Sequence, residues 1–237
     1  MQEKERQSVP ELSIVMPCRN EEKTVGICVK AARRFLDENE INGEIIVVDN
    51  ASSDKSEIIA KKNGASIIKE KRIGYGRALR TGINACKGKV IIMGDCDTTY
   101  DFSAIWDMYR LLAEEKSDII IGNRFKGGIK KGAMPLSHKI GVRVLSFLGR
   151  MKYKTDIGDF HCGLRGMTKN AAMKMKFHTI GMEFATEMIA EAKRNDLRIM
   201  EVPVVLRRCI YDRKSKLRTV RDGFRHLSYI KGGKNKK

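Results

Sequence analysis

The stretch that decides the fold is residues 89–97, which read KVIIMGDCD. Its short β-branched apolar run, closed by Gly94, predicts a buried strand. Asp95 and Asp97 follow directly, so two carboxylates stand at the strand's carboxyl end. Carboxylate oxygens are the hard ligands that suit Mg²⁺ or Mn²⁺, and such an ion can bridge the phosphates of a nucleotide. An acidic pair is also common in turns, so its position after a strand carries the argument.

Similar apolar runs at 12–16, 44–48, 65–68 and 118–121 predict further strands. The residues between them have helical spacing, at 21–35, 54–62, 75–85 and 102–113. This alternation predicts βαβ units, and therefore an α/β fold with a mostly parallel sheet and flanking helices. Ligands bind such sheets at the carboxyl ends of the strands, where Pro17, Asp49 and Asp95 stand.

The second half of the chain has a different rhythm. A Gly/Lys-rich loop is expected at 125–135, a helical stripe at 140–151, a glycine-interrupted segment at 160–167, a helix at 182–194 and a strand at 198–206. In the terminal helix we expect one apolar face, formed by Leu217, Val220, Phe224 and Leu227. That face either docks on the core or lies on an anionic membrane surface. Glu183 and Glu187, four residues apart on one helix face, either pair with basic loop residues or are solvated.

We expect a single catalytic domain with short flanking segments. The predicted boundaries are a tail at 1–10, the domain at 11–206 and a basic segment at 207–237. Within the domain, the change of rhythm after Gly122 divides the chain into halves at 11–122 and 123–206.

The net charge of +18 is uneven, with twelve Lys and Arg against two Asp from residue 207 onward. This predicts an anionic partner: nucleic acid, a phosphorylated ligand or an anionic lipid surface. Nucleic acid is disfavoured because aromatic residues make up only 6% and the acidic residues gather where a basic groove would be needed.

The apolar runs are far shorter than the ~20 residues that span a bilayer, and the first ten residues lack an apolar leader segment. We therefore expect a cytoplasmic protein, either free or peripheral on the inner face of the cell membrane. Six dispersed cysteines without a CxxC pair predict small buried thiols.

Several short sequence motifs follow one another along the chain in an order that can be compared with known families. They are PCRNE at 17–21, VVDNASSD at 47–54, GYGRALRTG at 74–82, GDCD at 94–97, GNRF at 122–125, DFHCGLRG at 159–166, GMEFATEM at 181–188 and SKLRTVRDGFRHL at 215–227. With them the chain resembles the family 2 glycosyltransferases of the GT-A fold. It is most similar to polyprenyl-phosphate sugar synthases of the dolichol-phosphate-glucose and dolichol-phosphate-mannose type.

The resemblance implies an inverting, metal-dependent transfer of a hexose from a nucleotide sugar to a polyprenyl or dolichyl phosphate. UDP-glucose is favoured as the donor, and GDP-mannose is compatible. The alternative acceptor is a small molecule, a peptide or a polysaccharide precursor, and a soluble enzyme would act on it.

The resemblance also implies that 11–122 is the nucleotide-binding half of the catalytic domain and 123–206 the acceptor half, and it assigns residues. The implied nucleotide-sugar contacts are Pro17, Asn20, Glu21, Asp49, Lys71, Gly76, Asp95 and Arg124. The implied metal ligands are Asp95 and Asp97, and the implied catalytic residues are Asp159, Asp97 and Arg165. The implied contacts to the acceptor phosphate are His138, Lys139, Arg143, Arg213, Ser215 and Lys216. Asp159 is expected to act as a base or, with a phosphate acceptor that is already charged, to orient and balance charge.

Overall fold

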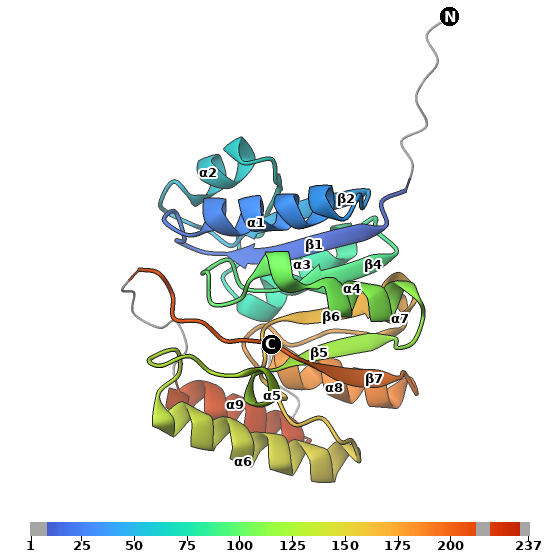
Figure 1. Cartoon of the computed structure of the whole chain (residues 1–237). Coiled ribbons are helices and arrows are strands. Elements are labelled where there is room, and N and C mark those ends of the chain that lie inside the picture. The colour runs from blue at the N-terminus through green and yellow to red at the C-terminus, as the bar shows by residue number, and fades with distance from the viewer. Residues whose placement is uncertain (1–8, 212–218, 233–237) are drawn as a thin grey trace, which may run out of the picture.

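The computed structural model describes residues 9–211 and 219–232. Its centre is a seven-stranded sheet in the order β3-β2-β1-β4-β6-β5-β7 (Figure 1). The strands are β1 Leu12–Cys18, β2 Gly43–Asp49, β3 Ser66–Lys69, β4 Val90–Met93, β5 Ile119–Asn123, β6 Arg165–Thr168 and β7 Ile199–Pro203. The expected α/β fold with a mostly parallel sheet is confirmed.

The parallel half of the sheet is built from the apolar runs. All four residues of β4 are buried, as are the last five of β2, because helices cover both faces of these strands. Parallel pairing aligns Cys18 of β1 with Asp49 of β2, and Val15 of β1 with Met93 of β4. The carboxyl ends of the three strands therefore meet at one edge of the sheet.

β6 is the strand that reverses direction. It runs antiparallel to both β4 and β5, with Arg165 opposite Met93 and Ile121. The glycine-interrupted sequence at 160–167 does not predict this strand. Gly166 has a packing reason, since a Cβ there would meet Leu112 Cδ1 at 2.6 Å.

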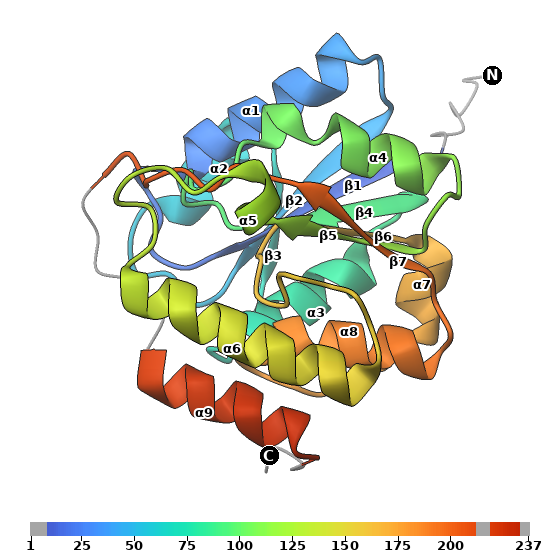
Figure 2. The same cartoon turned by 60° about the horizontal axis from the view of Figure 1, so that its bottom comes forward.

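The helices form layers around the sheet. They are α1 Val25–Glu38, α2 Ser56–Lys62, α3 Tyr75–Ala85, α4 Trp106–Ala113, α5 Arg124–Gly127, α6 Leu136–Tyr153, α7 Lys169–Lys174, α8 Phe184–Arg194 and α9 Thr219–Ile230, with a short 3₁₀ helix at Phe102–Ala104. Figure 2 shows α1 and α4 on one face of the sheet and α3 and α8 on the other. α6 and α9 lie side by side beyond α8, at the lower end of Figure 1.

The terminal helix α9 docks differently from the sequence expectation. Its buried side chains are Asp222, His226 and Ile230, while Phe224 of the expected apolar face is 67% exposed. The reason is that α8 presents polar groups to α9, so α9 binds through polar partners. The side chains of Leu217 and Val220 lie outside the described part of the chain.

Two smaller findings complete the fold. The expected loop at 125–135 begins with the helical turn α5, whose first amides are capped by Asn123 Oδ1. Among the described residues, no helix is long and apolar enough to cross a membrane.

Candidate active site

A cavity of about 1220 Å³ begins at the carboxyl ends of β1, β2 and β4 and extends to α6 and α9. It brings together seven of the predicted site residues. They are Pro17, Glu21, Asp95, Asp97, Arg124, His138 and Arg165. Residues from both halves of the chain thus share one space, which is the geometry that a two-substrate reaction needs.

Asp49 is the last residue of β2, next to Asn50, which lines one end of this cavity; Asp49 itself is not one of the lining residues. Asp49 is 7% exposed, and its Oδ1 has no hydrogen-bond partner within the described part of the chain. A buried carboxylate oxygen without a donor is costly, so this atom is suited to accept a hydrogen bond from a ligand. Asn50 lines the cavity and also holds the loop that follows β3. Its Nδ2 donates to the carbonyls of Glu70 and Arg72, and its Oδ1 accepts from the Gly74 amide.

The loop after β1 is tied to the loop after β2. Asn20 Oδ1 accepts from the Ser53 amide at 2.8 Å, and the Glu21 amide donates to Ser56 Oγ at 2.7 Å. Asp54 accepts from the Ser56 amide at the start of α2, as expected of a capping carboxylate. These bonds fix the cavity wall. Of the two predicted residues in the loop after β1, Glu21 lines the cavity and Asn20 does not.

Asp95 and Asp97 lie in the middle of the cavity wall. Asp97 is 6% exposed, and its Oδ1 accepts from the Thr99 amide at 2.9 Å and from the Thr99 hydroxyl. A Cβ on Gly163 would lie 2.7 Å from Asp95 Oδ2, so the loop before β6 approaches this carboxylate as only a glycine can. In the portion of the chain that the structure describes, no group of three or more His, Cys, Asp or Glu side chains gathers for a metal. The protein would supply two carboxylates, and a bound ion would take its other oxygen ligands from diphosphate and water.

Asp159 is sealed by Arg124. Asp159 is 0% exposed, and its carboxylate accepts from Arg124 Nε and Nη2, each at 2.7 Å, and from the Arg124 amide at 3.1 Å. Burial disfavours the arginine's charge, but the neighbouring Tyr100 and Asp159 groups outweigh it and raise the pKa of Arg124. Arg124 lines the cavity, so the carboxylate holds a cation at the cavity wall.

Arg165 also lines the cavity but is 2% exposed. Its guanidinium donates to the backbone carbonyls of Cys162, Ala185 and Phe160. These bonds fasten the 160–165 segment to α8. Burial lowers the pKa of Arg165 from its ordinary value.

The glutamates of α8 are buried and paired. Glu183 is 0% exposed and accepts from Arg225 Nη2 of α9 at 2.9 Å, and Glu187 accepts from the amides of His178 and Thr179. The solvated reading of these two residues is therefore wrong. The partner of Glu183 comes from α9, and this pair helps to hold α9 against the cavity.

Two histidines join α9 to the segment after Asp159. The rings of His161 and His226 meet edge to face, with centroids 4.3 Å apart, and His226 Nδ1 bonds Thr186 Oγ1 at 2.8 Å. Burial lowers the pKa of His226 to about 4 and that of His161 well below its ordinary value. Both imidazoles are therefore neutral near pH 7. Neither ring nitrogen of His161 has a hydrogen-bond partner among the described residues.

Other predicted site residues lie outside the main cavity wall. Lys139 and Arg143 of α6 line a smaller cavity of about 310 Å³ beside Arg124. Gly76 is packed behind the wall, where a Cβ would meet the Thr179 carbonyl at 2.7 Å, and Lys71 is exposed on the loop that Asn50 holds. Arg213, Ser215 and Lys216 lie outside the described residues.

The sequence reasoning missed three residues that shape the cavity: Asn50, Gly163 and His226. Asn50 and Gly163 stand inside quoted motifs, next to Asp49 and Cys162, so their positions were available as a signal. His226 also stands inside a quoted motif, at 215–227, but its role shows only in the contacts of its ring with Thr186 and His161.

Comparison with known proteins decides the family. The model described as "Glycosyl transferase family 2" matches residues 13–175, which is more than half of the chain. This chain is a family 2 glycosyltransferase. The resemblance stated from the motifs is thereby confirmed.

Relatives of the chain include two proteins of Haloferax volcanii. "Low-salt glycan biosynthesis hexosyltransferase Agl6" is 34% identical over 93% of this chain, which spans 53% of that relative's length. "Dolichyl-phosphate hexose transferase" is 27% identical, with 83% of both chains covered.

A solved structure shares the fold of this family 2 chain. Glucosyl-3-phosphoglycerate synthase from Mycobacterium tuberculosis, in complex with Mg²⁺ and uridine diphosphate, aligns with a TM-score of 0.75 and 18% identity over 95% of this chain and 81% of its own. This confirms the expected GT-A architecture.

Proposed function

We propose that this chain transfers a hexose from a nucleoside diphosphate sugar to a polyprenyl phosphate, with inversion at the anomeric carbon. UDP-glucose is the favoured donor and GDP-mannose the second. The chain works peripherally, at the cytoplasmic face of the membrane. A relative named as a dolichyl-phosphate hexose transferase supports the acceptor class, and the solved relative with bound uridine diphosphate supports the donor class.

The nucleoside binds at the β2 end of the cavity. The Asp49 Oδ1 atom, buried and without a donor among the described residues, accepts from a base N–H or a ribose hydroxyl. Pro17, Asn20 and Glu21 form or brace the wall beside it. Lys71 and Gly76 belong to the segment that borders the nucleotide.

Asp95 and Asp97 hold Mg²⁺ or Mn²⁺ against the diphosphate. Two carboxylates at one cavity wall fit a hard divalent ion, and both are oxygen donors. When bound, the ion neutralises charge on the departing diphosphate. The loop at Gly163 lies close to the Asp95 carboxylate.

The acceptor phosphate enters from the side of α6 and α9. One of its oxygens attacks the anomeric carbon, the bond from that carbon to the diphosphate oxygen breaks, and the nucleoside diphosphate leaves. A phosphate is already an anion near neutral pH, so no base has to remove a proton. The positive charge that receives it comes from Arg124, which Asp159 orients, and from Arg165, and His138 lines the same cavity wall.

Basic residues beyond the cavity extend this positive field toward the acceptor. Lys139 and Arg143 line the smaller cavity beside Arg124. The proposed contacts at Arg213, Ser215 and Lys216 lie outside the described residues and rest on the sequence motif alone.

The observation that carries the proposal is the single cavity that joins Pro17 and Asn50 at the ends of β1 and β2, the acidic pair Asp95 and Asp97, and the helices α6 and α9. The test is transfer of labelled hexose from UDP-glucose and, separately, from GDP-mannose to a polyprenyl phosphate, with Mg²⁺, with Mn²⁺ and with EDTA. Metal-dependent formation of a glycolipid is the expected result. No glycolipid from either donor would refute the proposal.

The second candidate is transfer to a small phosphorylated acceptor in solution. The solved relatives named as glucosyl-3-phosphoglycerate synthases favour it. The same assay decides between the two, because a water-soluble glycoside formed from phosphoglycerate in place of the glycolipid supports this candidate.

A further inference from the structure

One face of α6 is apolar and exposed along its whole length. Leu136, Ile140, Val144, Phe147 and Met151 are 72, 57, 52, 52 and 66% exposed. Their spacing of three and four residues places them on one side of the helix. At ~1.5 Å per residue this face is about 22 Å long. We call these five side chains the α6 face.

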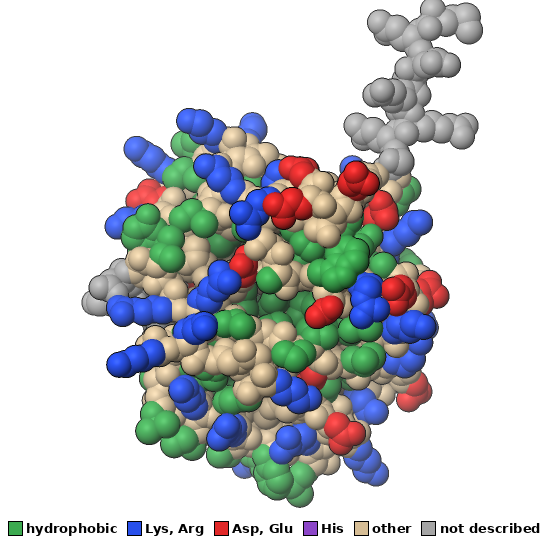
Figure 3. Space-filling model, viewed as in Figure 1, with side chains coloured by type: hydrophobic (Ala, Val, Ile, Leu, Met, Phe, Trp, Pro, Cys, Tyr) green, Lys and Arg blue, Asp and Glu red, His purple; other side chains and the backbone are tan. Residues whose placement is uncertain are grey.

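The α6 face continues onto α9. Phe224 is 67% exposed, and α9 packs beside α6 (Figure 2). In Figure 3 hydrophobic side chains stand out along the lower edge, where α6 lies in Figure 1, with Lys and Arg side chains beside them. A contiguous apolar surface of this kind marks an interaction site, whereas single exposed apolar residues are ordinary.

The charged side chains of α6 itself are all of one sign. α6 contains Lys139, Arg143, Arg150 and Lys152 and no Asp or Glu. Arg143 lies over the ring of Phe125, 4.9 Å from its centroid, and Arg150 lies 6.0 Å from that of Phe147. An apolar helix face bordered by cations is the pattern that inserts into the headgroup region of an anionic bilayer.

The same pattern argues against a second copy of the chain as the occupant. A two-fold interface would place the α6 helices of both copies against each other. Each would bring four cations and no α6 carboxylate to pair with them, and like charges oppose such contact.

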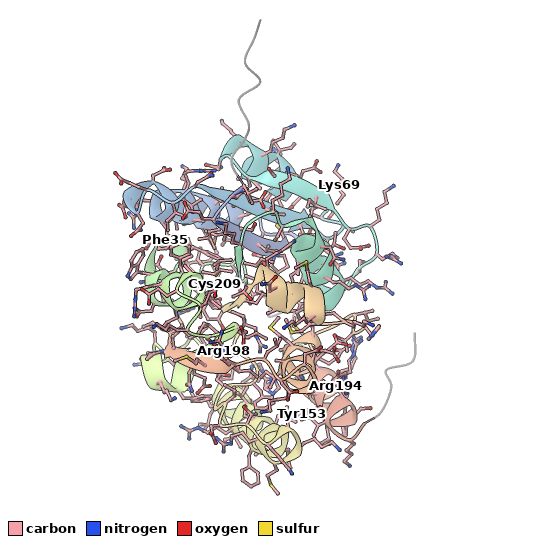
Figure 4. The ribbon with its side chains drawn as sticks, turned by 90° about the vertical axis from the view of Figure 1, so that its right-hand side faces the viewer. Phe35, Lys69, Tyr153, Arg194, Arg198 and Cys209 are labelled. Atoms are coloured by element: carbon pink, nitrogen blue, oxygen red, sulfur yellow. The ribbon has the colours of Figure 1, made fainter. Side chains whose placement is uncertain are left out.

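The α6 face is also joined to the cavity. Val142 and Leu145 of α6 line the cavity from within, and Val144 and Phe224 both line it and are exposed. An apolar chain lying in the bilayer would therefore meet apolar side chains of both α6 and α9 where it reaches the cavity. The opposite side of α6 packs toward α8, at the end of the molecule where Figure 4 labels Tyr153 and Arg194.

We propose that the α6 face, continued by Phe224, docks the protein on an anionic lipid bilayer with the cavity mouth at the headgroups. This deepens the proposed function, since it rests on a membrane-borne acceptor and names the surface that reaches it.

The test is co-sedimentation with vesicles of phosphatidylcholine and of phosphatidylcholine with about 30% phosphatidylglycerol, because anionic lipid attracts basic protein surfaces. Salt at about 50 mM and about 500 mM separates the electrostatic part of binding, because salt screens charges. The face variant is Ile140→Ser/Phe147→Ser/Met151→Ser. Its matched control is Ile58→Ser/Trp106→Ser/Met173→Ser, at residues that are also exposed, by 68, 45 and 68%, but dispersed over α2, α4 and α7. Unchanged thermal midpoints establish that both variants fold.

We expect the wild type and the control variant to bind anionic vesicles, more weakly at high salt, and the face variant to lose at least about tenfold in partition coefficient. Equal binding by the face variant, or no binding by the wild type, would overturn the inference. So would a dimer in sedimentation velocity that the face substitutions dissociate, with no vesicle binding.

Hexose transfer separates this inference from the proposed function. With a short, water-soluble prenyl phosphate, the face variant should turn over as the wild type does and lose rate only with vesicle-borne acceptor. Face-dependent vesicle binding without transfer to either acceptor would refute the proposed function and leave the docking surface standing.

Discussion

Replacing Asp159 by Asn tests whether this carboxylate is a clamp for Arg124. The substitution keeps the shape of the side chain but removes its charge and one of its two acceptor oxygens. In the wild type both oxygens are used, since Asp159 accepts from Arg124 Nε and Nη2 at 2.7 Å each. In the Asp159→Asn variant, the new amide would therefore turn an N–H donor toward one of the guanidinium N–H groups.

The magnitude follows from burial. The Asp159 side chain is 0% and the Arg124 side chain 9% exposed, so solvent cannot compensate for the lost charge. Removing one partner of such a pair costs about 3–5 kcal/mol. We expect the free energy of unfolding of Asp159→Asn to fall by that amount, measured by urea denaturation followed by circular dichroism. Asp156→Asn, an exposed change in the same loop, should stay within about 0.5 kcal/mol of the wild type.

A double variant sharpens the test. Arg124→Met/Asp159→Leu removes both charges and should recover most of the lost stability, because no buried charge is left without a partner. Activity should remain low in this variant, since the cation at the cavity wall is gone. If Asp159→Asn is as stable as the wild type but inactive, the clamp is refuted and a direct proton-transfer role is supported.

Three further changes test other parts of the site. Asp97→Asn should nearly abolish metal-dependent hexose transfer while the thermal midpoint stays close to that of the wild type, and wild-type turnover would remove the metal-site argument. Gly163→Ala places a Cβ 2.7 Å from Asp95 Oδ2, so we expect at least about a tenfold weaker dependence on Mn²⁺ in a titration of transfer rate; an unchanged Mn²⁺ titration would contradict this contact. The pKa of His226 is about 4 in the folded protein against 6.5 for the free side chain. Between pH 4 and pH 6.5, the unfolded chain therefore binds a proton at His226 and the folded chain does not. Stability should therefore fall by about 1.4 kcal/mol per pH unit as the pH drops from 6.5 toward 4. In His226→Gln that loss should be smaller, measured by urea denaturation at several pH values, and an identical pH dependence would show that His226 does not titrate in this way.

The strands show which elements of the fold a local sequence pattern can predict. β1, β2, β4 and β5 follow from short β-branched runs because a strand buried on both faces has to be apolar throughout. β6 escaped prediction because it contains Arg165 and Gly166, whose presence in a strand is explained only by the carbonyls and the Leu112 side chain that they meet.

The candidate site divides in the same way. Asp95 and Asp97 were located from the residues alone, since a parallel sheet brings the carboxyl ends of its strands to one edge. The pairing of Asp159 with Arg124 was beyond the sequence, because 35 residues separate them and only the packing of the loop against α5 brings them together.

By itself the amino-acid sequence determined the α/β fold, the edge of the sheet that carries the acidic pair and the glycosyltransferase family, because these depend on local periodicity and on motif order. Only the tertiary structure decided that α9 docks through Arg225 and His226 and that α6 turns its apolar residues outward. The physical reason is that an apolar stripe specifies a face of a helix but not its partner. What the face meets depends on the polar groups that neighbouring helices present, and α8 offered Glu183 and Thr186 to α9.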